Sequence, residues 1–190
     1  VVFNTSASIS VIIILSLVTS ISNTFHSLST VNITVDHAGH LIHVITSLKS
    51  IFALRDKFGI IFQSHYLFRG FNAQENLEIS SLLSGEPIDD NLIKSLNIDF
   101  VMDQNIGELS GGQQQRLSIA RVLTKKPAII FADEPTGNLD KETALDVMNV
   151  LFEYINNNNS GLIIVTHEDK IAYECDHVYK FDDNNLKKIK

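Results

Sequence analysis

The sequence predicts an α/β fold with a largely parallel β-sheet, because short apolar segments alternate with stretches of helical periodicity. Three of the apolar segments end in polar or charged residues, as buried parallel strands do: "FGIIFQ" (58–63), "AIIFADE" (128–134) and "GLIIVTHE" (161–168). Hydrophobic residues make up 44% of the 190-residue chain, which is enough to form the core of one domain.

Residues 1–48 differ in composition from the rest of the chain and yield no predicted element. They contain no lysine or arginine, one acidic residue (Asp36), one glycine (Gly39), fifteen serines or threonines and four of the seven histidines. Their Val, Ile, Ser and Thr content suits strands, but alternation is poor and no Gly, Pro or Asp occurs in the first 30 positions. The apolar run from Val11 to Val18, eight residues long, is too short to span a membrane, and no basic segment precedes it as in a signal peptide.

Three histidines of this segment, His37, His40 and His43, recur at three-residue intervals next to Asp36. A metal site on a helix face is one interpretation of that spacing. The β-branched neighbours argue against a helix, so we prefer histidines scattered through an irregular segment.

The helical segments follow the strands in order. Between the first two strands, the segment of about 64–107 is predicted to be an inserted helical subdomain with breaks at "SGEP" and "NID". A helix that Gln113 begins comes next, with apolar positions at Leu117, Ala120 and Leu123 or Thr124. The last predicted helix carries Leu145, Met148, Phe152 and Ile155, and "NNNNSG" (156–161) is predicted to be the loop before the third strand.

Charge and cysteine content narrow the classes of partner. The net charge is −7 and the isoelectric point is near 5.4, so bulk electrostatics gives no attraction for nucleic acid or for an anionic membrane surface. An anionic ligand would have to be held by local geometry. The single cysteine, Cys175, can form no internal disulfide and no cysteine metal site, which agrees with a reducing, cytosolic compartment.

Polar side chains follow all three strands, at the edge where open α/β sheets bind ligands. Of the two carboxylates after the second strand, Asp133 can hold hydrated Mg²⁺ on nucleotide phosphates, and Glu134 can orient or deprotonate an attacking water. His167 ends the third strand, where it can contact a terminal phosphate, and Gln63 ends the first, where its amide can bind metal or water. Taken singly, the carboxylates can also cap a helix or pair with the neighbouring lysines, and the histidine can be structural.

Ser110, Gly111 and Gly112 stand just ahead of the helix that Gln113 begins. Free backbone N–H groups and the positive helix end make such a segment an anion site, and glycine lets a phosphate approach closely. A plain N-cap with a flexible lead-in explains the same residues equally well.

Five motifs, in order, resemble those of the ATP-binding cassette (ABC) ATPases. "IIFQSHYLF" (60–68) is similar to their Q-loop, "LSGGQQQR" (109–116) to the signature motif and "IIFADEPT" (129–136) to the Walker B segment. "GNLD" (137–140) is similar to the D-loop and "IIVTHE" (163–168) to the segment of the switch histidine. The resemblance covers roughly residues 50–182 and implies a P-loop NTPase-like (RecA-like) parallel sheet core with an inserted helical subdomain.

The resemblance implies ATP and Mg²⁺ as cofactors and gives the strand-end residues their roles. Asp133 would hold Mg²⁺ through water, and Gln63 would sense both the metal and a membrane partner. Glu134 would be the general base, and His167 would contact the γ-phosphate.

The resemblance also implies partners. Two cassettes of this family close head to tail around two nucleotides, so Ser110, Gly111, Gly112 and Gln113 would bind ATP held by a second ATPase subunit in a homo- or heterodimer. Asp140 would communicate across that dimer. A transmembrane permease subunit would be energised by this cassette, bound peripherally at the cytoplasmic face of the inner or plasma membrane.

The sequence "DEPTGNLD" together with "FQSHYLF" is similar to the sequences of the subgroup that drives lipoprotein release, macrolide export and cell division. Of these processes we prefer lipoprotein release. A cassette acting on DNA would need a long coiled coil or zinc modules, and the sequence has neither. No nucleic-acid partner is therefore expected.

The phosphate loop of this family, G-x-x-x-x-G-K-[ST], has no match in the sequence. It is expected about 40 or more residues before Gln63, where residues 1–48 offer one glycine and no lysine to build the phosphate cradle. Each lost charge-assisted hydrogen bond contributes about 1.5 to 3 kcal/mol, so nucleotide binding is predicted to weaken by orders of magnitude.

Three explanations fit the missing loop: a damaged or frameshifted N-terminus, a catalytically silent or truncated cassette that completes a partner's ATP site, and a normal cassette whose loop escapes matching. We prefer the first, which divides the chain into an atypical segment (1–48) and an ABC ATPase domain (49–190) with an incomplete N-terminal core. The uncovered apolar faces predict a poorly stable, aggregation-prone chain. Cooperative thermal unfolding above about 50 °C would contradict that expectation.

Overall fold

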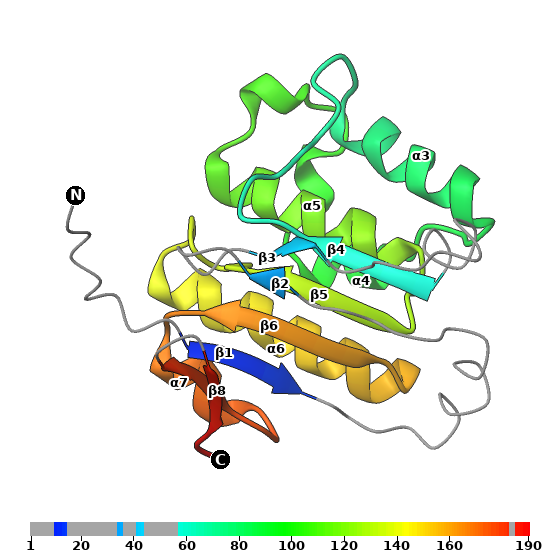
Figure 1. The fold of residues 1–190 in the computed structure, drawn as a ribbon. Coiled ribbons are helices and arrows are strands. Elements are labelled where there is room, and N and C mark those ends of the chain that lie inside the picture. Colours follow the sequence, from blue (N-terminus) through cyan, green and yellow to red (C-terminus); the bar gives the residue numbers. More distant parts are fainter. Residues whose placement is uncertain (1–9, 15–33, 36–40, 44–56, 183–184) are drawn as a thin grey trace.

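The computed structural model describes residues 10–14, 34–35, 41–43, 57–182 and 185–190. Within these residues the main sheet has the strand order β4-β5-β6-β1-β7-β8 (Figure 1). Its strands are β1 (Ser10–Ile14), β4 (Phe58–Ile61), β5 (Ile129–Asp133), β6 (Gly161–Thr166), β7 (Tyr179–Asp182) and β8 (Asn185–Lys188). Strands β2 (Thr34–Val35) and β3 (Leu41–His43) form a separate antiparallel pair.

The predicted parallel core is confirmed in strands β4, β5 and β6. Ala132 of β5 lies opposite Ile61 of β4 on one side and Ile164 of β6 on the other, in parallel register. All six residues of β6 are buried, which explains why this strand reads as an unbroken apolar run. Because the three strands run the same way, the polar residues that follow them meet at one edge of the sheet.

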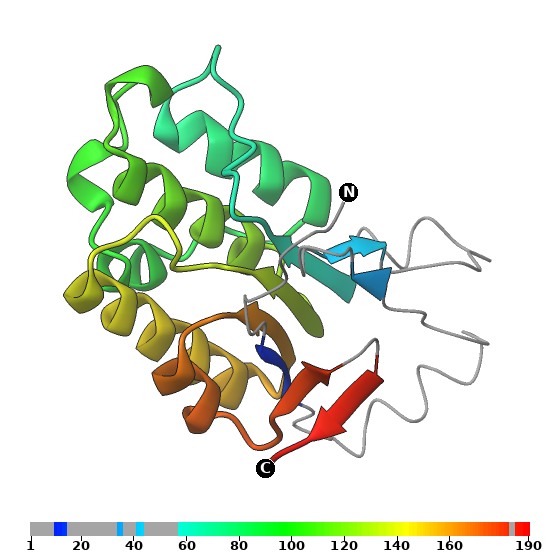
Figure 2. The same ribbon diagram turned by 60° about the vertical axis from the view of Figure 1, so that its left-hand side comes forward.

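The other half of the sheet is antiparallel, which the sequence did not predict. Strand β1 pairs antiparallel with both β6 and β7, and β7 and β8 form a hairpin at the edge far from β4 (Figure 2). Strand β1 also lies in the segment for which no element was predicted. A short unbroken apolar run such as "SVIII" is compatible with a strand in the interior of a sheet.

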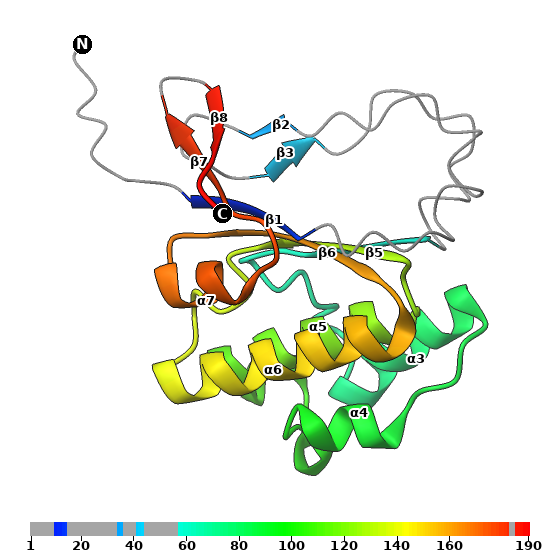
Figure 3. The same cartoon turned by 90° about the horizontal axis from the view of Figure 1, so that it is seen from below.

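The helices of the described residues lie together on one face of the sheet (Figure 3). They comprise α3 (Ala73–Ser84), α4 (Asp90–Ser95), α5 (Gly111–Thr124), α6 (Lys141–Asn158) and α7 (Asp169–Glu174), with 3₁₀ turns η2 (Asp99–Val101) and η3 (Ile106–Glu108). None of the helices among the described residues is long and apolar enough to cross a bilayer.

The segment predicted to be helical, about 64–107, holds α3, α4 and the two 3₁₀ turns. Helix α3 begins at a capping box in which Asn72 and Glu75 bond to each other's backbone N–H groups, and it ends at Gly85, whose φ of 76° suits glycine. The helix packs on α5, where its Ser80 hydroxyl donates to the Arg121 carbonyl at 2.6 Å, and its Leu77 is fully buried. This packing fixes the helical segment against the element that carries the signature motif.

Three local predictions need correction. Helix α5 begins at Gly111, two residues before Gln113, because Ser110 caps it. Helix α6 continues into the asparagine run and ends at Asn158, since Asn159 adopts a left-handed φ of 54° that asparagine tolerates. Leu145 is 51% exposed, because the stripe that α6 buries is Ala144, Val147, Met148, Leu151 and Ile155.

The interpretation of the three histidines lies mostly outside the described residues. His37 and His40 are not described, and His43 ends strand β3 without a described side chain. Among the residues that the structure does describe, no group of three or more His, Cys, Asp or Glu side chains could hold a metal ion.

Candidate active site at the ends of the parallel strands

The turn after β5, residues 133–137 (the β5 turn), carries the two predicted carboxylates. Asp133 is the last residue of β5 and is 6% exposed. Glu134 has a φ of 45°, a left-handed conformation that costs a residue with a side chain of order 1 kcal/mol or more. Backbone bonds hold it there, from the Glu134 N–H to Val165 O (2.9 Å) and from the Gly137 N–H to Glu134 O (3.0 Å). Strain kept in this way is typical of a functional turn.

Glu134 and His167 are in direct contact. Oε1 of Glu134 lies 2.7 Å from Nδ1 of His167 and accepts a second hydrogen bond from the His167 backbone N–H at 3.1 Å. The hydrogen bond to Glu134, followed by the charge of the same carboxylate, raises the pKa of His167 above its ordinary value of 6.5. The two residues that the sequence predicted as general base and phosphate ligand therefore form one pair.

The second carboxylate oxygen of Glu134, Oε2, is buried and has no hydrogen-bond partner within the described part of the chain. A buried acceptor without a donor is costly, so its retention fits a site that receives a donor such as water. Of the neighbouring lysines, Lys126 pairs with Glu86 at 2.7 Å rather than with Glu134. The geometry fits a general base whose proton donor comes from outside the chain.

Gln63 lies beside the β5 turn. A Cβ added to Gly137 would lie 3.4 Å from Nε2 of Gln63, and the Asn138 side chain donates a hydrogen bond of 3.0 Å to the Gln63 carbonyl. The structure thus places Gln63 against Gly137, the last residue of the turn that begins with Asp133 and Glu134. A carboxylate and an amide oxygen are the ligand types that Mg²⁺ prefers, so these residues fit a hydrated magnesium ion.

The start of α5, residues 110–113 (the α5 start), is capped by its own residues. The Ser110 Oγ accepts from the Gln113 N–H at 3.2 Å, and the Gln113 Oε1 accepts from the Ser110 N–H at 2.7 Å. In the described structure, the N–H groups of Gly111 and Gly112 have no hydrogen-bond acceptor. The segment is therefore an N-cap that leaves two backbone donors open, and its use as an anion site stays a prediction.

The D-loop residues join the α5 start to the β5 turn. A Cβ on Gly112 would meet Cδ2 of Leu139 at 3.3 Å, so the two segments pack closely. Asp140 caps α6 by accepting from the Thr143 N–H at 3.1 Å and from its hydroxyl at 2.7 Å. These bonds to Thr143 lower the pKa of Asp140. In the chain as described, Asp140 is the N-cap of α6, and the role that the resemblance implies for it stays a prediction.

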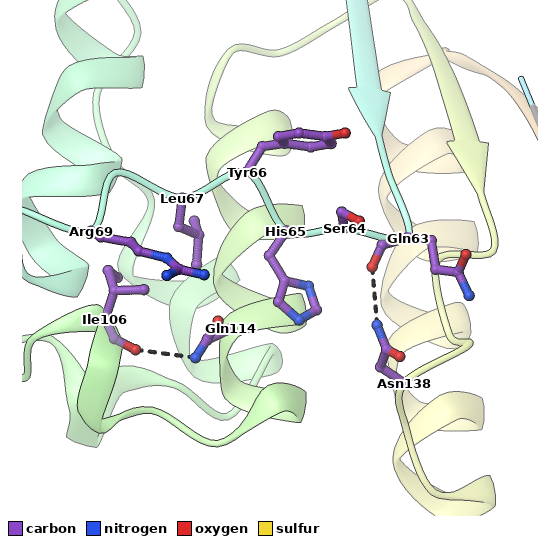
Figure 4. Close-up of a pocket in the computed structure, with 9 residues that line it drawn as sticks. All are labelled: Gln63, Ser64, His65, Tyr66, Leu67, Arg69, Ile106, Gln114 and Asn138. Carbon is purple, nitrogen blue, oxygen red and sulfur yellow. Dashed lines mark hydrogen bonds between the residues drawn. The ribbon is translucent and has the colours of Figure 1, made fainter. Parts of the chain in front are cut away.

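The Q-loop segment lines a cavity of about 580 Å³, whose wall also includes Gln114 of α5 and Asn138 of the D-loop (Figure 4). Helix α5 holds this segment through Arg121, whose guanidinium donates to Tyr66 O at 2.9 Å and lies over the Phe68 ring, 5.6 Å from its centroid. The lining residues are Gln63, Ser64, His65, Tyr66, Leu67, Arg69, Ile106, Gln114 and Asn138.

Two site residues were missed by the sequence analysis. Asn138 binds the Gln63 carbonyl, and Gln115 binds the Pro135 carbonyl of the β5 turn at 2.8 Å. Asn138 lies within the D-loop motif, which was a usable signal. Gln115 is one of three consecutive glutamines, and no feature of the sequence distinguishes the buried one.

Comparison with known proteins gives a consistent picture. The family model described as "ABC transporter" matches residues 19–137 and so begins inside the segment of unusual composition. The lipoprotein-releasing system ATP-binding protein LolD of Rickettsia felis is 42% identical over 128 residues, covering 64% of this chain and 58% of the relative. LolD of Treponema denticola is 37% identical over 150 residues, covering 74% of this chain and 66% of the relative.

Solved structures agree. The dimeric bacterial ABC transporter cassette MJ0796 is 30% identical, with a TM-score of 0.58, and covers 66% of this chain and 58% of that protein. Its post-hydrolysis state bound to ADP and Pi has a TM-score of 0.62 at 29% identity, covering 72% and 64%. The chain thus spans about 58 to 66% of the length of these relatives. The family model covers more than half of the chain, so the chain belongs to the ABC transporter family.

Proposed function

We propose that the chain is the ATP-hydrolysing subunit of an ABC transporter of the lipoprotein-release type, which energises a transmembrane permease. The observation that carries this proposal is Glu134, held by His167 through one oxygen and left without a donor at the other. A carboxylate in this state is suited to accept a proton from an attacking water.

Bound Mg²⁺ and ATP would supply the phosphoanhydride bond and the metal charge that neutralises its phosphates. Asp133 and the Gln63 amide are the residues that would hold the metal. Glu134 Oε2 would take the proton of the water, and the exposed His167 ring would contact the terminal phosphate. The raised pKa of His167 supports that contact, because a protonated ring attracts an anion.

The open N–H groups of Gly111 and Gly112 support a second ATPase subunit as partner. They lie at the start of a helix where Gly111 is exposed, and no atom lies within 4 Å of a Cβ added to Gly111. Such donors suit a phosphate that the partner holds. Relatives named LolD support lipoprotein release as the process, and the cavity next to Gln63 is the position proposed for a permease segment at the cytoplasmic face of the membrane.

A second candidate is a catalytically silent cassette that only completes the ATP site of a partner. One observation favours it: no G-x-x-x-x-G-K-[ST] pattern occurs in the 190 residues. Without that loop, the residues described above would still present Gly111 and Gly112 to a partner's nucleotide.

ATP affinity of the isolated chain separates the two candidates. Equilibrium dialysis with Mg²⁺ and labelled ATP is expected to give a Kd in the micromolar range for a hydrolysing subunit, about −8 kcal/mol at 1 μM. Absence of binding at millimolar ATP would overturn the first candidate. The silent cassette would then be tested by mixing the chain with an intact cassette of the LolD type. The wild-type chain should raise the partner's ATP turnover, whereas a chain altered at the α5 start should not.

A further inference from the structure

Gln115 is a fully buried polar residue that the proposed function does not use. It belongs to helix α5, and its exposed fraction is 0%. Its Nε2 donates to Pro135 O at 2.8 Å and to Phe62 O at 3.5 Å. Its Oε1 lies 2.5 Å from Nδ1 of His65. One amide therefore touches the Q-loop at two points and the β5 turn at a third.

These contacts determine the orientation of the amide and the tautomer of the histidine. Two of the partners are carbonyl oxygens, which only accept, so the NH₂ group must face them. The amide oxygen then faces His65, and since it also only accepts, Nδ1 of His65 must carry a proton. In the neutral ring the other nitrogen, Nε2, has no proton and can accept a hydrogen bond.

We propose that Gln115 is a positioning residue that holds His65 in the Nδ1–H tautomer and joins the Q-loop to the β5 turn. The Q-loop contributes Phe62 and His65, and the β5 turn contributes Pro135, which directly follows Glu134. Movement of the Q-loop by itself would leave buried polar groups unpaired, so the two segments move together.

The tautomer also determines what the cavity can recognise. His65 lies in the wall of the cavity (Figure 4), and in the described part of the chain its Nε2 makes no hydrogen bond. A docked segment that presents an N–H or O–H donor would be preferred over one that presents an acceptor. This consequence rests on the proposed function of the cavity, whereas the tautomer itself does not.

Long-range ¹H–¹⁵N NMR correlations of the uniformly labelled 190-residue chain test the tautomer directly, with His65 assigned by the signals that disappear in His65→Gln. At a pH where the ring is neutral, the wild-type chain is expected to show His65 mainly as Nδ1–H. Free neutral histidine favours Nε2–H, so this pattern is distinctive. A wild-type spectrum dominated by Nε2–H would overturn the proposal, and no nucleotide is needed, so failure of ATP binding leaves the result interpretable.

Three variants separate positioning from general stability. Gln115→Leu should shift His65 toward Nε2–H, whereas Gln115→Glu keeps an acceptor and should retain the proton on Nδ1. Both should move the ¹³C shift of the Pro135 carbonyl, which loses its donor. Asn76→Leu is the matched control, because Asn76 is also a fully buried amide but bonds only to backbone atoms of Phe68 and Asn72.

The control variant, Asn76→Leu, should leave the His65 tautomer and the ¹³C shift of the Pro135 carbonyl unchanged. Identical His65 patterns in wild type and Gln115→Leu would overturn the positioning role. An unchanged ¹³C shift of the Pro135 carbonyl in both Gln115 variants would overturn the link to the β5 turn. If Gln115→Leu does not fold, the wild-type tautomer and the Gln115→Glu carbonyl shift still decide both parts.

Discussion

The β5 turn and the α5 start are both polar segments of the site, but they are constructed in opposite ways. In the β5 turn the Glu134 side chain is 14% exposed, its backbone is left-handed, and one of its oxygens is buried without a donor. At the α5 start Ser110 is exposed and its side chain and that of Gln113 satisfy each other's N–H groups, while two glycine N–H groups remain open.

The two segments are therefore suited to different tasks at a phosphate, namely proton transfer and anion binding. The β5 turn concentrates side-chain charge in a partly enclosed place, which suits proton transfer within one chain. The α5 start presents backbone donors at an exposed helix end, which suits an anion brought by another molecule. The first segment should therefore be sensitive to a change of one side-chain atom, and the second to the addition of a Cβ.

The largest expected effect comes from Glu134→Gln. The substitution keeps the size of the side chain but removes the proton acceptor, so ATP turnover of the chain assembled with its permease should fall about 10² to 10⁴-fold. Glu142→Gln is the control, because Glu142 is exposed on the first turn of α6. Turnover measured by phosphate release should be unchanged in that variant. Equal turnover in Glu134→Gln and wild type would remove the general-base role.

A second, smaller effect separates the two glycines of the α5 start. Gly112→Val should place a Cβ 3.3 Å from Leu139 and lower the free energy of unfolding by about 1 to 3 kcal/mol through overpacking. Gly111→Val carries the same change in helix propensity, but nothing lies within 4 Å of its Cβ, so most of that loss should be absent. Urea unfolding of the two variants measures the difference. Equal losses would mean that the D-loop does not pack on the α5 start.

The sequence predicted where the site lies but not how its residues are paired. Apolar runs that end in Gln63, Asp133 and His167 were sufficient to place these side chains at one edge, because parallel strands align their ends. The bond between Glu134 and His167 joins residues 33 positions apart and depends on the left-handed turn at Glu134, which no local propensity favours. Tertiary contacts determine that turn.

The fold was predictable to a similar extent. Apolar periodicity was sufficient to place α5 and α6, with errors of a few residues at their ends, and the segment predicted to be helical does contain helices. The place of β1 between β6 and β7 was not, since a short apolar run does not say which strands it joins or in which direction. The role of residues 1–48, and their division from the rest of the chain, stays a prediction.

The smallest expected effect concerns pH and tests whether the β5 turn holds its histidine as a charged pair. The pKa of His167 is raised mainly by its hydrogen bond to Glu134, so the folded chain binds that proton more tightly than the unfolded chain does. The stabilisation is complete below the ordinary value of 6.5 and disappears as pH rises through the raised value of the folded state. This stabilisation should be small, because the His167 side chain is 67% exposed and solvent screens the pair.

NMR titration of the His167 ring should show its pKa falling in Glu134→Gln, where a neutral amide replaces the carboxylate, and staying raised in the Glu142→Gln control. A His167 pKa that is the same in both variants would mean that the contact is neutral, and the contrast between a charged β5 turn and an uncharged α5 start would then rest on Asp133 and Glu134 alone.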